Sequence, residues 1–164
     1  MASDLSESAL SFAARYGLAL LEPLGSGIHG IVHVVQSNAK GGRTALKVHH
    51  SMEFYRRELE AYLRLQAAGI RQILGFAVPQ LIRADDELRG LEMTVVEKPY
   101  VLDFAGAYLD APPDFPEEKW LEWEADKQEK FGDHWPRVQE VLAALEDLGI
   151  HMLDVNPGNV AFRD

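Results

Sequence analysis

The feature that most constrains this sequence is a glycine-rich run, G-x-G-x-x-G-x-V, between two stretches with the apolar pattern of β-strands. Its glycines are Gly25, Gly27 and Gly30, and its valine is Val32. The same spacing occurs in dinucleotide-binding proteins, where a helix follows the glycines directly and its N-terminus meets the phosphates. Here residues 31–35 are Ile, Val, His, Val and Val, which favour a strand. The sequence therefore predicts a glycine-rich loop between two antiparallel strands, with an ordinary glycine-rich hairpin as the alternative to a phosphate-binding loop.

The pattern of apolar and turn-forming residues along the rest of the chain indicates an α+β fold. Helical spacing predicts helices at 4–16, 51–68, 116–131 and 136–148, whereas β-like runs between turn residues predict strands at 18–24, 31–36, 44–49, 80–84 and 91–97. Ser51 is expected to cap the second helix, and Pro136 can open the last one, where its missing N–H costs nothing. We expect an N-terminal helix at 1–17, a sheet-containing lobe at 18–98 and a mainly helical part at 99–164.

Composition excludes several classes of protein. The chain has 164 residues, of which 47% are hydrophobic and 26% charged, as is usual for a globular protein. Its net charge of −10 repels phosphate backbones and anionic membranes, so we expect neither nucleic-acid nor membrane binding. The sequence contains no cysteine, no secretory signal and no apolar run near the ~18 residues of a membrane helix. These features are typical of a cytoplasmic protein.

A lysine and a glutamate are placed to meet inside the protein. Lys47 lies within the apolar strand predicted at 44–49, and a lysine there is costly to bury unless it is paired. On the helix that follows, Glu58 falls in a stripe of otherwise apolar residues that begins at Phe54. The two side chains are therefore expected to form a pair that holds the amine towards phosphate oxygens. A structural ion pair, or a lysine whose head reaches water, is the alternative.

The most specific signal is the hexapeptide D-V-N-P-G-N at residues 154–159, which follows the last predicted helix and the tripeptide Gly-Ile-His. An acid and an amide five residues apart suit phosphoryl transfer. Asp154 would orient the attacking hydroxyl or accept its proton, and Asn159 would hold a divalent metal ion that bridges the phosphates. An Asx-type turn around Pro-Gly is the alternative for this hexapeptide taken alone.

The glycine-rich run, the lysine, the glutamate and the acid–amide pair stand in the order found in protein kinases. Residues 18–164 resemble a protein-kinase-like fold of the minimal kind found in bacterial proteins, and D-x-x-P-G-N also resembles the small-molecule phosphotransferase branch. The resemblance implies a five-stranded antiparallel N-lobe with one αC-type helix. It also implies a reduced helical C-lobe that ends just after the catalytic loop, with ATP and Mg²⁺ as cofactors.

The resemblance assigns roles to individual residues. Those that would contact nucleotide or metal, or serve catalysis, are Gly25, Gly27, Gly30, Val32, Lys47, Glu58, Glu97, Asp154 and Asn159. Residues 91–103 resemble the strand and hinge that contact adenine, with Val96 as gatekeeper and the Glu97 carbonyl facing the adenine amine. His29, at the tip of the glycine-rich loop, is a candidate phosphate contact, with an exposed loop histidine as the alternative.

The sequence also departs from the family pattern. Met-Leu precedes Asp154 where the family has His-Arg, Asn156 replaces a lysine, and Pro99 falls where the hinge donates an N–H to adenine, although proline has none. In the family, an Asp-Phe-Gly whose aspartate is the main metal ligand follows the hairpin that Val160 begins. This sequence ends at Asp164, so we expect that metal-binding aspartate to be absent from it; the alternative is a fragment of a longer protein in which the aspartate follows.

Two functions stay open at this point. The first is an ATP-dependent phosphotransferase, of serine/threonine-kinase type, that acts on a hydroxyl group of a protein or a small molecule. The second is a catalytically inactive pseudokinase that serves as a protein-interaction or regulatory module. In the family, later helices cover one side of the helix Val138–Leu148. Without them we expect that side to be covered by the Trp120–Trp123 segment, the N-terminal helix, a second copy in a homodimer or a protein partner.

Overall fold

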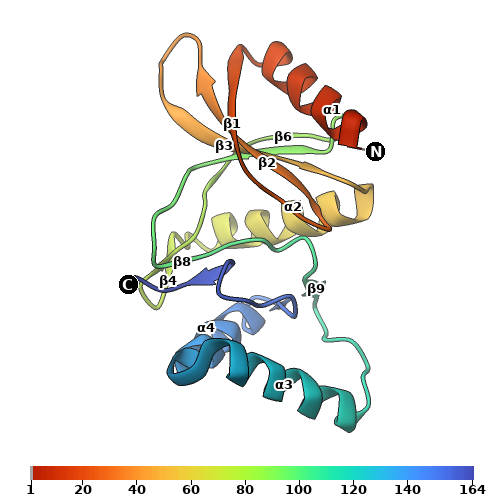
Figure 1. Ribbon diagram of the computed structural model, residues 1–164, viewed down its shortest axis with the longest axis vertical. Helices are drawn as coiled ribbons and strands as arrows, with labels where there is room; N and C mark the ends of the chain where they lie inside the picture. The colour runs from red at the N-terminus through yellow and green to blue at the C-terminus, as the bar shows by residue number, and fades with distance from the viewer. Residues whose placement is uncertain (1) are drawn as a thin grey trace.

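A five-stranded antiparallel sheet organises the first part of the chain in the computed structural model, which describes residues 2–164 (Figure 1). Its strands, in spatial order, are β1 (Leu18–Ser26), β2 (Gly30–Ser37), β3 (Arg43–His49), β7 (Gly90–Met93) and β6 (Leu81–Asp85). The α+β class and the five antiparallel strands expected from the sequence are therefore confirmed. The glycine-rich run forms the turn between β1 and β2, where Gly25 pairs with Val32.

Helix α1 (Ala2–Arg15) covers one face of the sheet (Figure 1). Phe12 of this helix shares a hydrophobic cluster with Leu46 and Val48 of β3. The two strand residues point to the same face because side chains alternate along a strand. A Cβ at Gly90 would lie 2.7 Å from the Phe12 ring, so glycine is what lets the helix lie this close to the sheet.

Helix α2 (Met52–Ala67) lies on the opposite side of the sheet from α1 (Figure 1). Ser51 is its N-cap, because the Ser51 hydroxyl accepts a hydrogen bond from the Phe54 N–H at 3.2 Å, as the sequence predicted. The side chains that the helix buries are Tyr55, Glu58, Ala61, Tyr62 and Leu65. Glu58 is the charged member of this buried set, so a carboxylate lies inside the protein beneath β3.

The predicted strand at 91–97 is wrong in its last four residues, because β7 ends at Met93. The backbone N–H of Thr94 still donates to the Gln80 carbonyl at 2.9 Å, and the Thr94 hydroxyl accepts from the Gln80 N–H at 2.8 Å. The pairing of β7 ends at Met93 on both sides, opposite Leu81 of β6 and opposite Ala45 of β3. The chain beyond Thr94 leaves the sheet as a connection to the C-terminal part.

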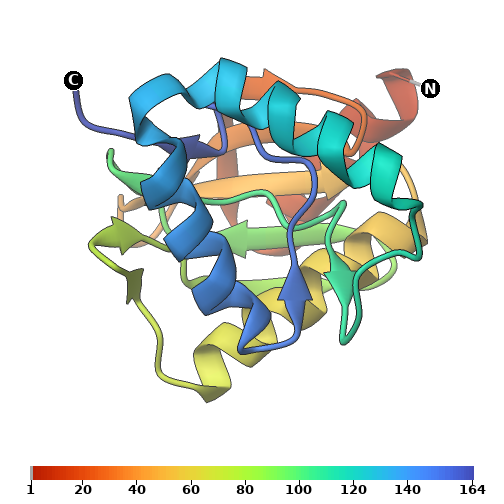
Figure 2. The same ribbon diagram turned by 90° about the horizontal axis from the view of Figure 1, so that it is seen from below.

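The C-terminal part contains two helices, α3 (Glu117–Phe131) and α4 (Trp135–Glu146), which contact each other on either side of the 3₁₀ turn Gly132–His134 (Figure 2). The remaining strands are short: β4 (Gln72–Ile73), β5 (Phe76–Ala77), β8 (Tyr100–Val101), β9 (Tyr108–Leu109), β10 (Ile150–His151) and β11 (Val160–Ala161). Strand β8 pairs antiparallel with β11, and β9 pairs antiparallel with β10. The segment that follows the sheet therefore lies beside the C-terminal segment.

The apolar side of α4 is buried within the chain. Val138, Val141 and Leu145 are fully buried in the main hydrophobic core, against which Trp123 of α3 also packs. The Trp123 indole N–H donates to the Leu153 carbonyl at 3.0 Å and so ties α3 to the loop that follows β10. Of the coverings expected from the sequence, the tryptophan segment is the one present, while a partner stays a prediction. Within residues 2–164, no helix is long and apolar enough to cross a membrane.

Candidate functional site

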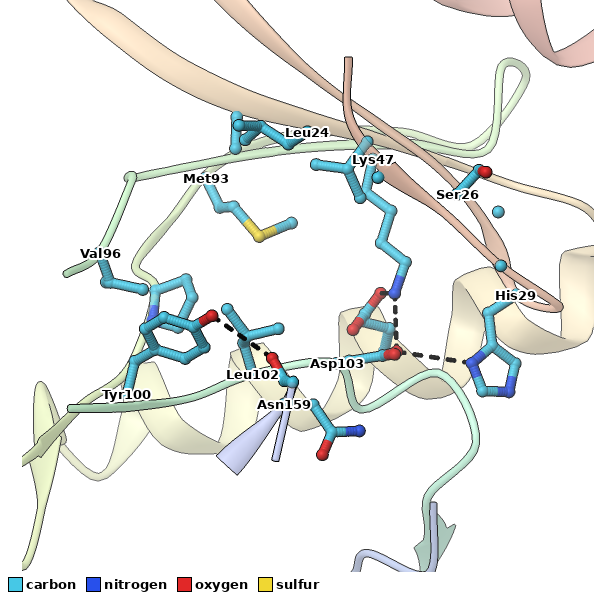
Figure 3. Close-up of a pocket in the computed structure, with 18 of the residues that line it drawn as sticks. Leu24, Ser26, His29, Lys47, Met93, Val96, Tyr100, Leu102, Asp103 and Asn159 are labelled. Carbon is cyan, nitrogen blue, oxygen red and sulfur yellow. Dashed lines mark hydrogen bonds and ion pairs between the residues drawn. The ribbon is translucent and has the colours of Figure 1, made fainter. Parts of the chain in front are cut away.

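A cavity of about 690 Å³ lies between the sheet and the two loops that run beneath it (Figure 3). Apolar side chains gather at one end, where Leu24, Met93, Val96 and Leu102 lie around an open space (Figure 3). The polar side chains that line the cavity are His29, Lys47, Glu58, Asp103, Asp154 and Asn159. The cavity thus offers an apolar slot next to a charged end, which is the usual character of a small-molecule site.

Lys47 is the centre of the charged end. It lies on β3, opposite Val32 of β2 and Leu91 of β7, so the sheet holds its backbone on both sides. Its Nζ atom is 2.8 Å from Glu58 Oε1, which is the pair that the sequence predicted. It is also 2.8 Å from Asp103 Oδ1, a partner that the sequence analysis did not foresee (Figure 3).

The charges of this cluster support one another. Burial alone would raise the pKa of Glu58, but the charge of Lys47 and the hydrogen bond from His49 lower that pKa to about 2. Burial alone would lower the pKa of Lys47, but Glu58 and Asp103 together raise it. At neutral pH the cavity therefore contains a fixed ammonium group and an ionised carboxylate.

Two further donors hold Glu58 in place. Its Oε2 atom accepts a hydrogen bond from the Phe104 N–H at 2.6 Å, and its Oε1 atom lies 2.7 Å from His49 Nε2. The other ring nitrogen of His49 lies 3.0 Å from the Arg89 carbonyl oxygen. Both ring nitrogens of His49 thus lie at hydrogen-bonding distance from oxygen atoms, which fixes the orientation of the imidazole beside Glu58.

Asp103 is held against Lys47 by an unusual backbone conformation. Its φ angle is 71°, in the left-handed region that residues other than glycine rarely adopt, and such conformations gather at functional sites. Phe104, which follows, is fully buried and packs edge-on against Tyr62 with 5.3 Å between ring centroids. The carboxylate of Asp103 is 27% exposed, so its neighbours hold it at the cavity surface and do not seal it in.

The loop of Asp154 and Asn159 forms the opposite wall. The Asn159 side chain accepts a hydrogen bond from the Asn156 N–H at 2.9 Å and donates one to the Asp154 carbonyl at 2.5 Å. The side chain of Asn156 in turn accepts from the Gly158 N–H at 2.8 Å. The Asx-type turn considered for this hexapeptide is therefore present, and it leaves the Asp154 side chain 46% exposed in the cavity wall.

The tip of the glycine-rich loop carries His29 down into the cavity (Figure 3). The side chain is 8% exposed and packs edge-on against Phe54 with 4.7 Å between ring centroids, so the alternative of an exposed loop histidine is wrong. A Cβ at Gly30 would overlap the Val48 carbonyl oxygen, and one at Gly106 would lie 3.0 Å from the His29 ring. Both glycines are needed for this close approach of the loop.

The structure brings most of the predicted site residues together. Those that line the cavity are Gly25, Gly27, Gly30, Val32, Lys47, Glu58, Asp154 and Asn159. Glu97 is not among the lining residues, which here are Thr94, Val95 and Val96. The side chain that points into the cavity from the end of the strand is Met93 (Figure 3). Val96 therefore lines the cavity, as the predicted gatekeeper should, whereas Glu97 does not.

Asp103 is the functional candidate that the sequence analysis missed. In the sequence it stands only as the last residue of the hinge-like segment 91–103. The signal that could have found it is the tetrapeptide Asp-Phe-Ala-Gly at residues 103–106, which resembles the Asp-Phe-Gly sought elsewhere in the chain.

No protein-family model, curated protein or solved structure matches this chain. Its function is therefore inferred from the cavity and the residues that line it.

Proposed function

We propose that this chain binds a nucleoside triphosphate with a divalent cation and acts as a kinase-like phosphotransferase. The observation that carries the proposal is the meeting of Lys47 with Glu58, Asp103 and Asp154 in one cavity beneath a glycine-rich loop. A fixed ammonium group and two carboxylates can hold phosphates and their cation. The neighbouring apolar slot suits a flat base, and about 690 Å³ lies within the usual range of small-molecule sites.

We assign to Asp103 the part that the kinase family gives to the aspartate of Asp-Phe-Gly. In that family, this aspartate follows the second strand of the hairpin that begins after the catalytic-loop asparagine. Here the strand that pairs with β11 is β8, and Asp103 follows β8 directly after Leu102. The same spatial neighbours would thus arise from a different chain order, with the metal-binding segment before the catalytic loop. This arrangement supports Asp103 as the carboxylate that the sequence analysis expected to be absent.

The available ligand atoms suit Mg²⁺, which prefers oxygen. Asp103 and Asp154 offer carboxylate oxygens, and the amide oxygen of Asn159 accepts one hydrogen bond, from the Asn156 N–H, and keeps a second lone pair. When bound, the cation would neutralise charge on the phosphates. The residues that would hold it are Asp103 and Asn159, while Lys47 would contact phosphate oxygens and keep Glu58 as its partner.

Asp154 is suited to act as the base. Its carboxylate is half exposed in the cavity wall, so an acceptor hydroxyl can reach it from solvent. As the hydroxyl oxygen forms its bond to the γ-phosphorus, the bond from that phosphorus to the β–γ bridging oxygen breaks. The hydroxyl proton passes to Asp154, and a nucleoside diphosphate leaves.

The nucleobase of the bound nucleotide would lie in the apolar slot. We assign its backbone contacts to Val95 and Val96, which line the cavity, in place of Glu97 and Pro99, which do not. The missing N–H of Pro99 then no longer removes a contact to the base, because a residue nearer the strand takes that position.

A pseudokinase is the second candidate, and one observation favours it. His29 Nδ1 lies 3.5 Å from Asp103 Oδ1 and 3.8 Å from Asp154 Oδ2, so the loop closes the charged end against phosphates in this conformation. In a pseudokinase this closed state would persist, and the chain would act through a protein partner.

Calorimetric titration with ATP, with and without Mg²⁺, tests the proposal. We expect binding that Mg²⁺ strengthens and that Lys47→Ala and Asp103→Asn each weaken by at least about 10-fold, as the loss of a charged contact predicts. Asp133→Asn, outside the cavity, is the matched control and should bind as the unaltered chain does. No heat at millimolar ATP from a folded protein would refute nucleotide binding.

Phosphate transfer separates the two candidates. If the chain binds Mg²⁺–ATP and Asp154→Asn abolishes the slow release of phosphate to water or to a hydroxyl acceptor, the enzyme is supported. If release is absent in the unaltered chain although ATP binds, the pseudokinase is favoured and the role given to Asp154 is refuted.

A further inference from the structure

His29 is a buried imidazole aimed at two carboxylates across a gap. Its Nδ1 atom lies 3.5 Å from Asp103 Oδ1 and 3.8 Å from Asp154 Oδ2. These separations are longer than an ordinary hydrogen bond between a ring nitrogen and a carboxylate. The ring cannot turn freely towards water, because it is 8% exposed and packs against Phe54. A buried polar group aimed in this way indicates a place for a further atom.

The three ligand atoms have the spacing of a metal site. All of them lie within 4.8 Å of one another, and among the residues from 2 to 164 this is the cluster of three potential ligands that can hold an ion. A tetrahedral ion with bonds of about 2.0–2.1 Å keeps its ligands about 3.3–3.4 Å apart. The separations of 3.5 and 3.8 Å from His29 Nδ1 therefore need only a small inward movement.

We propose that His29, Asp103 and Asp154 bind one divalent transition-metal ion, with Zn²⁺ as the best fit, when no nucleotide occupies the cavity. Imidazole is a good ligand for Zn²⁺, whereas Mg²⁺ prefers oxygen ligands in an octahedral shell. Three protein ligands leave the fourth position of Zn²⁺ open to water or a phosphate oxygen. Lys47, which shares Asp103 Oδ1 at 2.8 Å, keeps its partner Glu58 if the ion displaces it.

Such an ion would lock the glycine-rich loop in its closed position. His29 belongs to the turn between β1 and β2, whereas Asp103 and Asp154 belong to the two loops beneath the sheet. An ion held by all three ties the roof of the cavity to its floor. Zinc binding itself does not depend on the proposed function. Competition between Zn²⁺ and the Mg²⁺–nucleotide does rest on the proposed function, because both would use the carboxylates of Asp103 and Asp154.

Calorimetry on the full chain, prepared without a histidine tag and stripped of metal by a chelator, tests the site. We expect one Zn²⁺ per chain, bound more tightly than Mg²⁺. His29→Ala should weaken Zn²⁺ binding by at least about 10-fold, since losing even an outer-shell partner of a metal site costs that much. His50→Ala, at an exposed histidine beside the same loop, is the control and should bind as the unaltered chain does. Equal Zn²⁺ affinity in His29→Ala, or no preference over Mg²⁺, would overturn the proposal.

Two further measurements guard against a general loss of structure in the variant. His29→Asp should lose affinity for Zn²⁺ and gain affinity for Mg²⁺, because it replaces the nitrogen ligand by oxygen. Hydrogen exchange of the amides at residues 25–30 should slow when Zn²⁺ is added to the unaltered chain, and should not change in His29→Ala. Unaltered exchange in both proteins would refute the locked loop.

The two proposals can fail separately. Zinc binding through His29 without any ATP binding would leave the metal site standing and refute the proposed function. ATP binding with Mg²⁺, but no zinc binding, would support the proposed function and refute the zinc site.

Discussion

Replacing Glu58 by glutamine tests whether the buried cluster stabilises the fold. The side chain keeps its size, but the charge that Lys47 and His49 face is removed. The new amide NH₂ also cannot accept from donors that the carboxylate now satisfies. Lys47 retains Asp103 as a partner, but the one remaining oxygen can serve only one side, so either His49 Nε2 or the Phe104 N–H loses its acceptor.

The expected loss can be estimated in two ways. The pKa of Glu58 falls from 4.5 to about 2 in the folded protein. At about 1.4 kcal/mol per pKa unit, this corresponds to roughly 3 kcal/mol of folding free energy from the ionised form. Breaking a buried ion pair by removing one partner typically costs about 3–5 kcal/mol. We therefore expect Glu58→Gln to lose about 3 kcal/mol in its free energy of unfolding at pH 7.

The pH dependence of this difference has a definite sign. Because the folded pKa is depressed, the contribution of Glu58 is fully present above pH 4.5 and is lost as the pH falls towards about 2. Glutamine does not titrate, so the difference between the two proteins should stay constant from pH 7 to 5. Below that range it should shrink by up to about 1.4 kcal/mol per pH unit.

Urea unfolding followed by tryptophan fluorescence at pH 7, 5, 4 and 3 measures the difference. Glu60→Gln is the matched control, because Glu60 is an exposed residue on the same helix whose ion pair with Arg64 is worth little. A loss below about 1 kcal/mol at pH 7 would contradict the reasoning, since breaking a buried pair costs several times more. A difference that stays constant down to pH 3 would contradict it as well.

Three smaller predictions follow from local geometry, each measured by thermal or urea unfolding. Gly30→Ala should cost about 1–3 kcal/mol because the new Cβ overlaps the Val48 carbonyl, whereas Gly27→Ala, which has open space around it, should be tolerated. Ser51→Ala removes the N-cap of α2 and should cost about 1 kcal/mol. Trp123→Phe removes an indole hydrogen bond to the Leu153 carbonyl and should cost about 0.5–1.5 kcal/mol, the usual value of one hydrogen bond, because that carbonyl still accepts from the Val155 N–H. A prediction is refuted if Gly30→Ala, Ser51→Ala or Trp123→Phe unfolds like the unaltered chain, or if Gly27→Ala is as unstable as Gly30→Ala.

Features set by local pattern could be predicted from the sequence. Helical periodicity identified Glu58 as an inward carboxylate. Because Lys47 lies on the strand directly before that helix, the contact between the two side chains could also be predicted. The glycine-rich loop and the Ser51 cap were also found, because each depends on neighbours within a few residues. In these cases the local preference and the folded structure agree.

Features that depend on contacts between segments far apart in the sequence could not be predicted from it. The position of Asp103 depends on β8 and β11, two-residue strands that lie far apart in sequence and are too short to show alternation. The end of β7 at Met93 depends on where its pairing with β6 and with β3 stops, which are both contacts with distant segments. The burial of His29 depends on a loop packing against Phe54, which no periodicity reveals.

Asp103 and Glu58 share one lysine, yet we expect them to contribute differently. Glu58 is fully buried, so its loss leaves buried donors unpaired, whereas the Asp103 carboxylate is partly exposed. Asp103→Asn keeps a residue type that tolerates the left-handed φ of 71°, and Lys47 keeps Glu58. The variant should therefore change the free energy of unfolding by less than about 1 kcal/mol, as for other partly exposed ion pairs.

The same variant should lose most Mg²⁺-dependent ATP binding and most Zn²⁺ binding, because both would use this carboxylate. Urea unfolding and calorimetry on one preparation measure the two effects together, with Glu58→Gln beside it. Asp103 would be only a structural partner of Lys47 if Asp103→Asn lost as much free energy of unfolding as Glu58→Gln does. In that case the variant would also bind ATP and Zn²⁺ as tightly as the unaltered chain at a temperature where it is folded. If the variant is stable but no longer binds, the left-handed backbone conformation of Asp103 at the edge of the cavity has an explanation. The strained residue then serves ligand binding and not the stability of the fold.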